Sequence, residues 1–239
     1  ETLRIKTPAV FSHAALQAFW AIMKSDRVFE TLSIMHRFRL LEKIVPEFGR
    51  LRNLVIFEMY HRYTVDEHTL IAIRNAEMLR HRYEPRRNYL RRFFSSIRPE
   101  IFYFAVLVHD IGKGNSRRHE GIGYRLLKPI LERFSISAED GARIAFLVRN
   151  HIVFSKLALR RDPESLETIH QLAETVGNEA NLDALYLMTY ADMSAVSPDF
   201  WTDWKDSLFQ VVYGKTRDML RALEADRPRI SDIDLLRFV

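Results

Sequence analysis

An apolar run that ends in an adjacent histidine and aspartate constrains this chain more than any other stretch. Residues 101–108 are apolar throughout, so the element that carries them should be buried on all sides. His109 and Asp110 follow directly, and a Gly-Lys-Gly turn over 112–114 comes next. Burying an imidazole and a carboxylate costs free energy unless something compensates. A metal ion would compensate both groups, and a buried His-Asp hydrogen bond that caps a core helix is the alternative.

The whole sequence is typical of an all-α protein. Only eight glycines and eight prolines occur in 239 residues, and helical periodicity is far commoner than strand alternation. No apolar run approaches the roughly 20 residues that span a bilayer. The chain has no cysteine, which excludes disulfides and thiolate-bound metals and leaves His, Asp and Glu as possible ligands. This composition fits a cytoplasmic protein.

Capping patterns and apolar periodicity predict the order of the helices. Thr64 and Glu67 form a capping box, Pro99 suits the first position of a helix, and Ser137 begins another capping signature. We expect helices over 12–24, 26–45 and 64–82, from Pro99 to the His-Asp pair, from His119, from Ser137, from Asp162-Pro163 to Gly177, from about Asn178, and from Ser197-Pro198. The last should pack through Trp201, Trp204, Leu208, Val211 and Val212.

Three parts are expected along the chain. Residues 1–50 read as an N-terminal helical extension, residues 51–225 as the domain that holds the chemistry, and residues 226–239 as a linker to a missing C-terminal region. The chain begins at Glu1 rather than Met, so we interpret it as a piece of a longer protein.

Separate predicted helices place imidazole and carboxylate groups at inward or terminal positions. His151 follows Ile144, Leu147 and Val148 on one apolar face, although a lone histidine there is more often a satisfied core residue. Asp192 also shares an apolar face, so it needs a cationic partner, either a metal or an arginine. His119 begins a helix, with Gly121 and Gly123 placed to let the backbone pack tightly; a cap or surface role is the alternative. His68 lies in the first turn of its helix; by itself it is more often a polar surface residue, and His61 and His81 are alternatives without this placement. The candidates are His68, His109, Asp110, His119, His151 and Asp192.

The order His, His-Asp, Asp resembles the HD superfamily of metal-dependent phosphohydrolases, an all-α fold built as a helical bundle. The resemblance implies that His68, His109, Asp110 and Asp192 hold one metal ion. His119 and His151 match the extra histidines of two-metal members, with Asp110 bridging. The cofactors implied are divalent ions, two of them, with manganese, magnesium, iron and zinc all compatible with such ligands.

Further strings narrow the resemblance to one family. They are Tyr-Thr-Val-Asp-Glu-His-Thr at 63–69, Leu-Val-Arg-Asn-His at 147–151, Arg-Arg-Asp at 160–162, Ala-Asp at 191–192 and Trp-Thr-Asp-Trp-Lys at 201–205. Together they are similar to the bifunctional uridylyltransferase/uridylyl-removing enzymes over about residues 30–222. The resemblance implies removal of UMP from a tyrosine of the PII nitrogen-signalling protein by phosphodiester hydrolysis. It also implies a nucleotidyltransferase domain before this region and ACT regulatory domains after it.

Within this mechanism, Asp110 and Lys113 are the catalytic candidates, and Lys113 and Arg149 are the candidates for binding substrate. Lys113 would contact a phosphate oxygen and stabilise charge on the leaving side. Hydrolysis of a free nucleotide or a cyclic dinucleotide is one alternative, but Arg125 follows Gly123-Tyr124 where the cyclic-dinucleotide class has a proline. A non-catalytic HD sensing module is another, although such a module needs no full set of ligands.

Arginines concentrate between Arg80 and Arg98, where seven of them alternate with aromatic residues in a chain of net charge +5. We interpret this stretch as a solvated loop and helix face. A surface for an acidic partner is the alternative, and nucleic acid is not an expected partner. The stretch is richer in arginine than the resemblance leads us to expect, which leaves a variant substrate or partner open.

Overall fold

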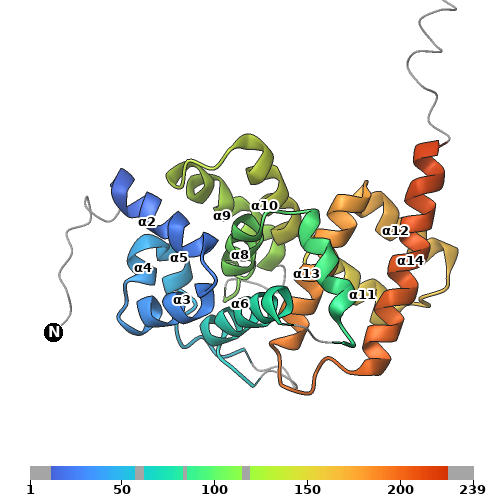
Figure 1. The fold of residues 1–239 in the computed structure, drawn as a ribbon, viewed down its shortest axis with the longest axis horizontal. Coiled ribbons are helices and arrows are strands. Elements are labelled where there is room, and N and C mark those ends of the chain that lie inside the picture. The colour runs from blue at the N-terminus through green and yellow to red at the C-terminus, as the bar shows by residue number, and fades with distance from the viewer. Residues whose placement is uncertain (1–11, 57–61, 83–84, 115–118, 226–239) are drawn as a thin grey trace, which may run out of the picture.

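The computed structural model describes residues 12–56, 62–82, 85–114 and 119–225, and within these ranges the chain is helical with no strand (Figure 1). The all-α prediction is therefore confirmed. None of these helices is both long and apolar enough to cross a membrane. The helices are α2 (His13–Lys24), α3 (Val28–Arg37), α4 (Leu41–Ile44), α5 (Pro46–Gly49), α6 (Val65–His81), α7 (Asn88–Arg91), the 3-10 helix η1 (Arg92–Ser95), α8 (Pro99–Val108), α9 (His119–Arg133), α10 (Ala138–Asn150), α11 (Val153–Arg160), α12 (Leu166–Val176), α13 (Glu179–Ser194) and α14 (Asp203–Ala225).

Helix α8 is the centre of the fold. Pro99 occupies its first position, as predicted, and every residue from Ile101 to Val108 is buried. Helices α2, α6, α10 and α13 pack around it, and Figure 1 shows α8 in the middle of the molecule. Because other helices surround α8, the His109-Asp110 pair at its C-terminal end lies in the interior of the protein rather than at the surface.

The N-terminal helices share this core. Phe19 of α2 lies with its ring centroid 6.2 Å from that of Phe104 in α8 and 5.1 Å from that of Phe134, which follows α9. Trp20 lies 5.3 Å from Phe104 by the same measure. One apolar cluster therefore runs from the first described helix into the helices that follow. The boundaries at 50 and 225 stay a prediction, and 226–239 lies outside the described residues.

Several predicted helix bounds are confirmed and others are wrong. The helix predicted over 26–45 ends at Arg37, because Arg39 has a left-handed backbone (φ 57°) and two short helices follow. The helix predicted from Asp162-Pro163 begins only at Leu166, while its end at Gly177 is confirmed by a left-handed cap (φ 68°). Helix α11, over Val153–Arg160, was not predicted at all.

The last helix also differs from its prediction. It begins at Asp203 rather than at Ser197-Pro198, and Trp204 is 66% exposed instead of packed. The buried face instead includes Asp206, whose carboxylate accepts hydrogen bonds from Trp201 Nε1 (3.1 Å) and Tyr89 Oη (2.5 Å). A satisfied carboxylate lets α14 bury a partly polar face, which an apolar pattern cannot predict.

Candidate metal centre

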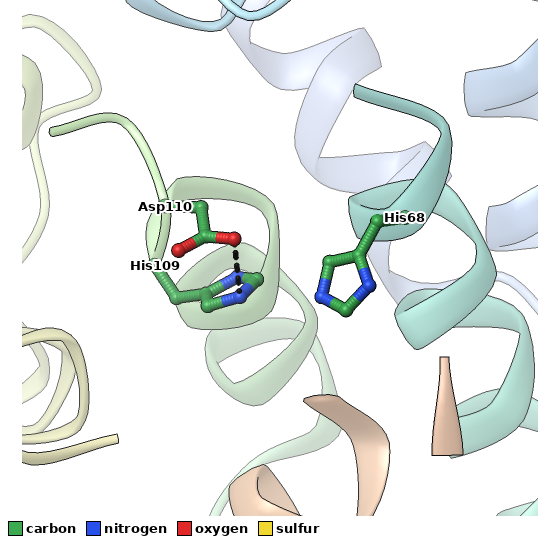
Figure 2. A group of neighbouring side chains, drawn as sticks. All are labelled: His68, His109 and Asp110. Atoms are coloured by element: carbon green, nitrogen blue, oxygen red, sulfur yellow. Dashed lines mark ion pairs between the residues drawn. The ribbon is translucent and has the colours of Figure 1, made fainter. Parts of the chain in front are cut away.

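Three predicted ligands from two helices converge at the C-terminal end of α8. His68 comes from α6, and His109 and Asp110 come from the residues that end α8 (Figure 2). One ligand atom from each lies within 4.8 Å of the others. All three side chains are buried, with at most 2% of the surface of each residue exposed. In Figure 2 the imidazole of His68 faces that of His109 across the gap between the two helices.

Helices α13 and α10 bring two more predicted ligands to the same place. Asp192 Oδ1 lies 2.9 Å from His68 Nε2 and 3.7 Å from His109 Nε2. His151, which caps α10, places its Nε2 3.9 Å from Asp110 Oδ1. Four helices distant in sequence therefore meet at one buried cluster.

The sixth predicted ligand, His119, begins α9 as expected, but its side chain lies outside what the structure describes. Its role as a ligand stays a prediction.

The orientation of two imidazoles is set by the backbone. His109 Nδ1 lies 2.7 Å from the carbonyl oxygen of Val106, and His151 Nδ1 lies 2.9 Å from that of Val148. A carbonyl oxygen can only accept, so Nδ1 carries the proton in both rings and donates it. In each ring Nε2 is consequently the atom turned toward the carboxylates. A hydrogen bond to the backbone through the other ring nitrogen is how metal-binding histidines are usually oriented.

The carboxylates of the cluster are ionised. Burial opposes their charge, but His109 and Lys113 hold the pKa of Asp110 well below its ordinary value, and the nearby imidazole of His109 together with a hydrogen bond from His68 does the same for Asp192. Lys113 Nζ lies 2.7 Å from Asp110 Oδ2. Two buried anions in one place are unusual unless cations accompany them.

The two central histidines differ in charge. Burial opposes protonation of His109, yet the adjacent Asp110 and Asp192 raise its pKa to about 10. Burial and the charge of His109 lower the pKa of His151 to about 4. The positive charge of the His109 imidazolium thus compensates the negative charges of the two carboxylates. The same carboxylates would attract a metal ion to this place equally well.

The donor set fits a divalent cation. His109 Nε2 is buried and makes no hydrogen bond within the described chain, lying instead 3.2 Å from Asp110 Oδ2. Mixed nitrogen and carboxylate ligands suit manganese, iron, zinc and magnesium. A cation bound here would take over the compensation that the proton of His109 provides.

The glycines near the cluster play different roles. Gly114 has a left-handed backbone (φ 84°), so the turn after Lys113 requires a residue without a side chain. A Cβ on Gly123 would lie 3.6 Å from the amide nitrogen of Gly112 and 3.7 Å from the carbonyl oxygen of His109, as tight packing of α9 predicts. Among the residues that the structure describes, none lies within 4 Å of a Cβ placed on Gly121, so these residues do not pack tightly against it.

Two groups define the side of the cluster that faces solvent. The side chain of Asp192 is 20% exposed and that of Lys113 is 13% exposed, whereas those of His109 and Asp110 are at most 1% exposed. Arg149, the other predicted substrate-binding residue, is exposed, and its guanidinium lies 5.4 Å from the centre of the Tyr124 ring. Its role toward a substrate stays a prediction.

Sequence reasoning missed the polar residues that hold α6 in place. His36 lies between two carboxylates, with Nε2 3.0 Å from Asp66 Oδ2 and Nδ1 2.9 Å from Glu42 Oε1. Asn75 Nδ2 donates to Ser194 Oγ (2.9 Å) and ties α6 to α13. Asp66 and Asn75 lie before and after His68 on α6, which also carries Glu67, Arg74, Glu77 and Arg80, so their polar character alone gave no signal.

Arginines of the basic stretch make ion pairs with neighbouring helices. Arg86 pairs with Asp203 at the start of α14 (2.7 Å), and Arg98 pairs with Asp140 in the first turn of α10. Both arginine side chains are nevertheless largely exposed, at 77% and 58%, which agrees with the interpretation of the stretch as a solvated loop and helix face. Residues 83–84 of the stretch lie outside the described chain.

Comparison with known proteins places these residues in a family context. The HD domain family matches residues 65–190, a span that includes His68, His109, Asp110 and His151. A bifunctional uridylyltransferase/uridylyl-removing enzyme of Methylococcus capsulatus is 36% identical over 189 residues, which cover 78% of this chain and 22% of that protein. Its counterpart in Acinetobacter baylyi is 33% identical over 219 residues, 88% of this chain and 24% of the relative. The chain therefore spans less than a quarter of the length of these two curated relatives.

Proposed function

This chain belongs to the HD domain family, and from that premise we propose that it is a metal-dependent phosphodiester hydrolase that removes UMP from a uridylylated PII-type protein. The observation that carries the proposal is the convergence of His68, His109, Asp110 and Asp192 into one buried cluster. Two ionised carboxylates among oriented imidazoles form a site for divalent cations rather than a simple cap. We propose two ions: His68, His109, Asp110 and Asp192 would hold one, and His119 and His151 would hold the other together with Asp110.

Different residues of the chain would retain the cations, contact the phosphate and limit the access of water. A phosphodiester resists attack because it is anionic and water is a weak nucleophile; divalent cations would neutralise the phosphate and make a bound water more acidic. Asp110 and Asp192 provide the negative charge that retains the cations. Lys113, beside Asp110 and partly exposed, is placed to contact a phosphate oxygen and to stabilise charge as the ester bond breaks. Burial of the histidines limits access of bulk water to the other side of the cluster.

The proposed substrate and neighbours rest on the relatives. Both named relatives combine uridylyltransferase and uridylyl-removing activities in their names, and both are more than four times as long as the region matched. We infer that a nucleotidyltransferase domain and ACT domains accompany this region in its parent chain, in the cytoplasm. The second activity in the relatives' names, removal of a uridylyl group, is a phosphodiester hydrolysis, which fits the chemistry of the cluster.

Release of UMP from uridylylated PII tests the proposal. In the presence of Mn²⁺ the wild-type chain should release UMP, chelation with EDTA should stop the release, and His109→Ala should reduce it at least 100-fold. His170→Ala is the matched control, because His170 is an exposed histidine of α12 whose side chain is 58% exposed. Full activity in His109→Ala would contradict the metal mechanism.

The same assay separates the alternatives. Hydrolysis of free nucleotides in preference to uridylylated PII would favour a nucleotide phosphohydrolase. No hydrolysis of either substrate, nor of bis-p-nitrophenyl phosphate, by a folded and metal-loaded protein would favour a sensing module.

A further inference from the structure

A set of connected polar side chains ties the N-terminal helices to the first turn of α6. His36 of α3 places Nε2 3.0 Å from Oδ2 of Asp66, and its Nδ1 lies 2.9 Å from Oε1 of Glu42 in α4. Arg52 donates from Nε to the same oxygen of Glu42 (2.7 Å) and from a terminal nitrogen to the backbone carbonyl of His36. We call these four connected residues the His36 network.

The network is largely shielded from water. The side chain of Asp66 is 4% exposed, and those of His36 and Glu42 are at most 14% exposed. Water and salt screen an exposed ion pair, whereas a buried carboxylate is costly unless hydrogen bonds satisfy it. Asp66 therefore requires the imidazole of His36 in one particular place, and the contacts of Glu42 and Arg52 hold that imidazole there.

The network ends two residues from a predicted metal ligand. Asp66 is the second residue of α6 and His68 is the fourth, so both lie in its first turn. At about 100° per residue, their side chains point about 160° apart around the helix axis. Asp66 faces His36 of α3, whereas His68 faces Asp192 of α13. The network thus holds this turn from the side opposite to the metal cluster.

The first turn of a helix needs such a contact more than its middle does. The first amides of a helix have no partners within it, and the Thr64 side chain makes no capping bond to the backbone of α6. Helices α3 and α6 pack against each other (Figure 1), but apolar packing is not directional. Hydrogen bonds require a defined distance and angle. The His36 network therefore provides a directional contact at the turn that carries His68.

The segment after Arg52 contacts both sides of the cluster. The carbonyl oxygen of Leu54 accepts a hydrogen bond from the amide of Val65, the first residue of α6 (2.9 Å). A Cβ on Gly114 would lie only 3.2 Å from Cδ2 of Leu54, so these two residues are in close contact. Leu54 consequently links the start of α6 to the turn that follows Lys113.

We propose that the His36 network positions His68 for metal binding, so that the N-terminal helices are a functional part of the metal centre. His36, Glu42 and Arg52 lie outside residues 65–190, which match the HD domain family. They act through α6 and touch neither metal nor substrate, which makes them positioning residues. This inference rests on the metal centre of the proposed function, and its test therefore includes a measurement without metal.

The measurement without metal is amide hydrogen exchange, followed by NMR in EDTA. The amide of His68 donates to the carbonyl oxygen of Thr64 (2.8 Å), so its exchange reports opening of the first turn of α6. His36→Ala should speed this exchange by about tenfold or more, because it removes a hydrogen bond to a buried carboxylate. Amides in the middle of α8 should exchange as in the wild-type chain.

The measurement with metal is the affinity for Mn²⁺, determined by isothermal titration calorimetry. Substituting residues that orient metal ligands typically weakens metal binding about 10–100-fold, and we expect about tenfold for His36→Ala. His36→Gln keeps an N–H donor in the side chain and should recover part of both losses. Arg52→Gln, at the more exposed end of the network, is a milder variant that should act in the same direction if His36→Ala does not fold.

Arg133→Gln is the matched control. Arg133 of α9 pairs with Glu47 of α5 through two hydrogen bonds (2.8 and 2.9 Å), so it also ties an N-terminal helix to a later one, and it is partly buried. Neither residue belongs to α6 or to the His36 network. A loss of stability alone would affect this variant and His36→Ala alike, whereas a positioning role predicts that only His36→Ala changes the exchange of His68 and the affinity for Mn²⁺.

The outcomes separate this inference from the proposed function. Faster exchange and weaker binding in His36→Ala, with partial recovery in His36→Gln, would support it. Unchanged exchange of His68 in His36→Ala, the same acceleration in Arg133→Gln, or an unchanged affinity for Mn²⁺ would overturn it. Failure of the wild-type chain to bind Mn²⁺ would instead refute the metal centre, and the exchange in EDTA would still decide whether the network fixes the turn that carries His68.

Discussion

Replacing Phe19 by alanine tests whether the N-terminal helices and the helices that carry the His68, His109 and Asp110 cluster form one cooperative unit. Phe19 is 1% exposed, and its ring packs against Phe104 of α8 and Phe134 beyond α9. Truncating a buried phenylalanine to alanine costs about 3–5 kcal/mol. Natural domains are stable by about 5–15 kcal/mol, so this substitution should remove a large share of the free energy of unfolding. For a chain of this size we expect the melting temperature to fall by about 6–20 °C.

Urea unfolding followed by circular dichroism and by tryptophan fluorescence measures the effect. Phe38→Ala is the matched control, because it makes the same chemical change at a side chain that is 72% exposed, and it should stay within about 0.5 kcal/mol of wild type. Both probes should report one transition that moves as a whole in Phe19→Ala. A loss below about 1 kcal/mol, or two transitions of which only the smaller moves, would refute a shared core.

Three further predictions concern acid stability, the glycines and metal binding. Although burial opposes its charge, hydrogen bonding from His36 lowers the pKa of Asp66 to about 2, so ionised Asp66 stabilises the fold above its unfolded pKa of about 3.8. About 2 kcal/mol should therefore be lost between pH 4 and 2, and urea unfolding across this range should show a smaller loss in Asp66→Asn. Gly114→Ala should destabilise by about 1–2 kcal/mol because its backbone is left-handed. Gly121→Ala, on a helix and away from the other described residues, should stabilise by up to about 1 kcal/mol. In urea unfolding, a stabilising Gly114→Ala or a destabilising Gly121→Ala would contradict the respective assignment. Mn²⁺ at 100 times its dissociation constant should stabilise the wild-type chain by about 2.7 kcal/mol in thermal melts, and equal stabilisation of His109→Ala would place the metal elsewhere.

Local signals predicted helix positions well where a cap lies within one turn. Pro99 begins α8, Ser137 accepts from the amide of Asp140, and Asn178 accepts from that of Asn181, so all three predicted starts are confirmed, the last two by a hydrogen bond between near neighbours. The start of α6 after Thr64 is confirmed as well, but the Thr64 hydroxyl makes no capping bond to the helix backbone and bonds to Asp66 instead. A capping pattern thus predicts the boundary even when its bonds differ.

Features that depend on distant parts of the chain could not be predicted this way. Nothing local requires Arg39 to adopt a left-handed backbone, and the apolar pattern of Trp204, Leu208 and Val211 does not tell which face of α14 meets the core. For the cluster, the residue types suggested a metal site, but only the packing of α6 and α13 brings Asp192 to 2.9 Å from His68. Spacing along the sequence holds no information on that distance.

The anchoring of His109 and His151 to the carbonyls three residues before them has a consequence for how such a centre can be varied. Each imidazole is oriented by the backbone at the end of its own helix. Substitution of the surrounding side chains therefore requires no compensating change to keep this orientation. The hydrogen bond that orients each ring lies entirely within one helix end, so it moves with that helix end. Inserting one turn into α8 or α10 would move the helix end and its imidazole by about 5.4 Å along the axis, which keeps the hydrogen bond of Nδ1 to the backbone but separates Nε2 from the carboxylates.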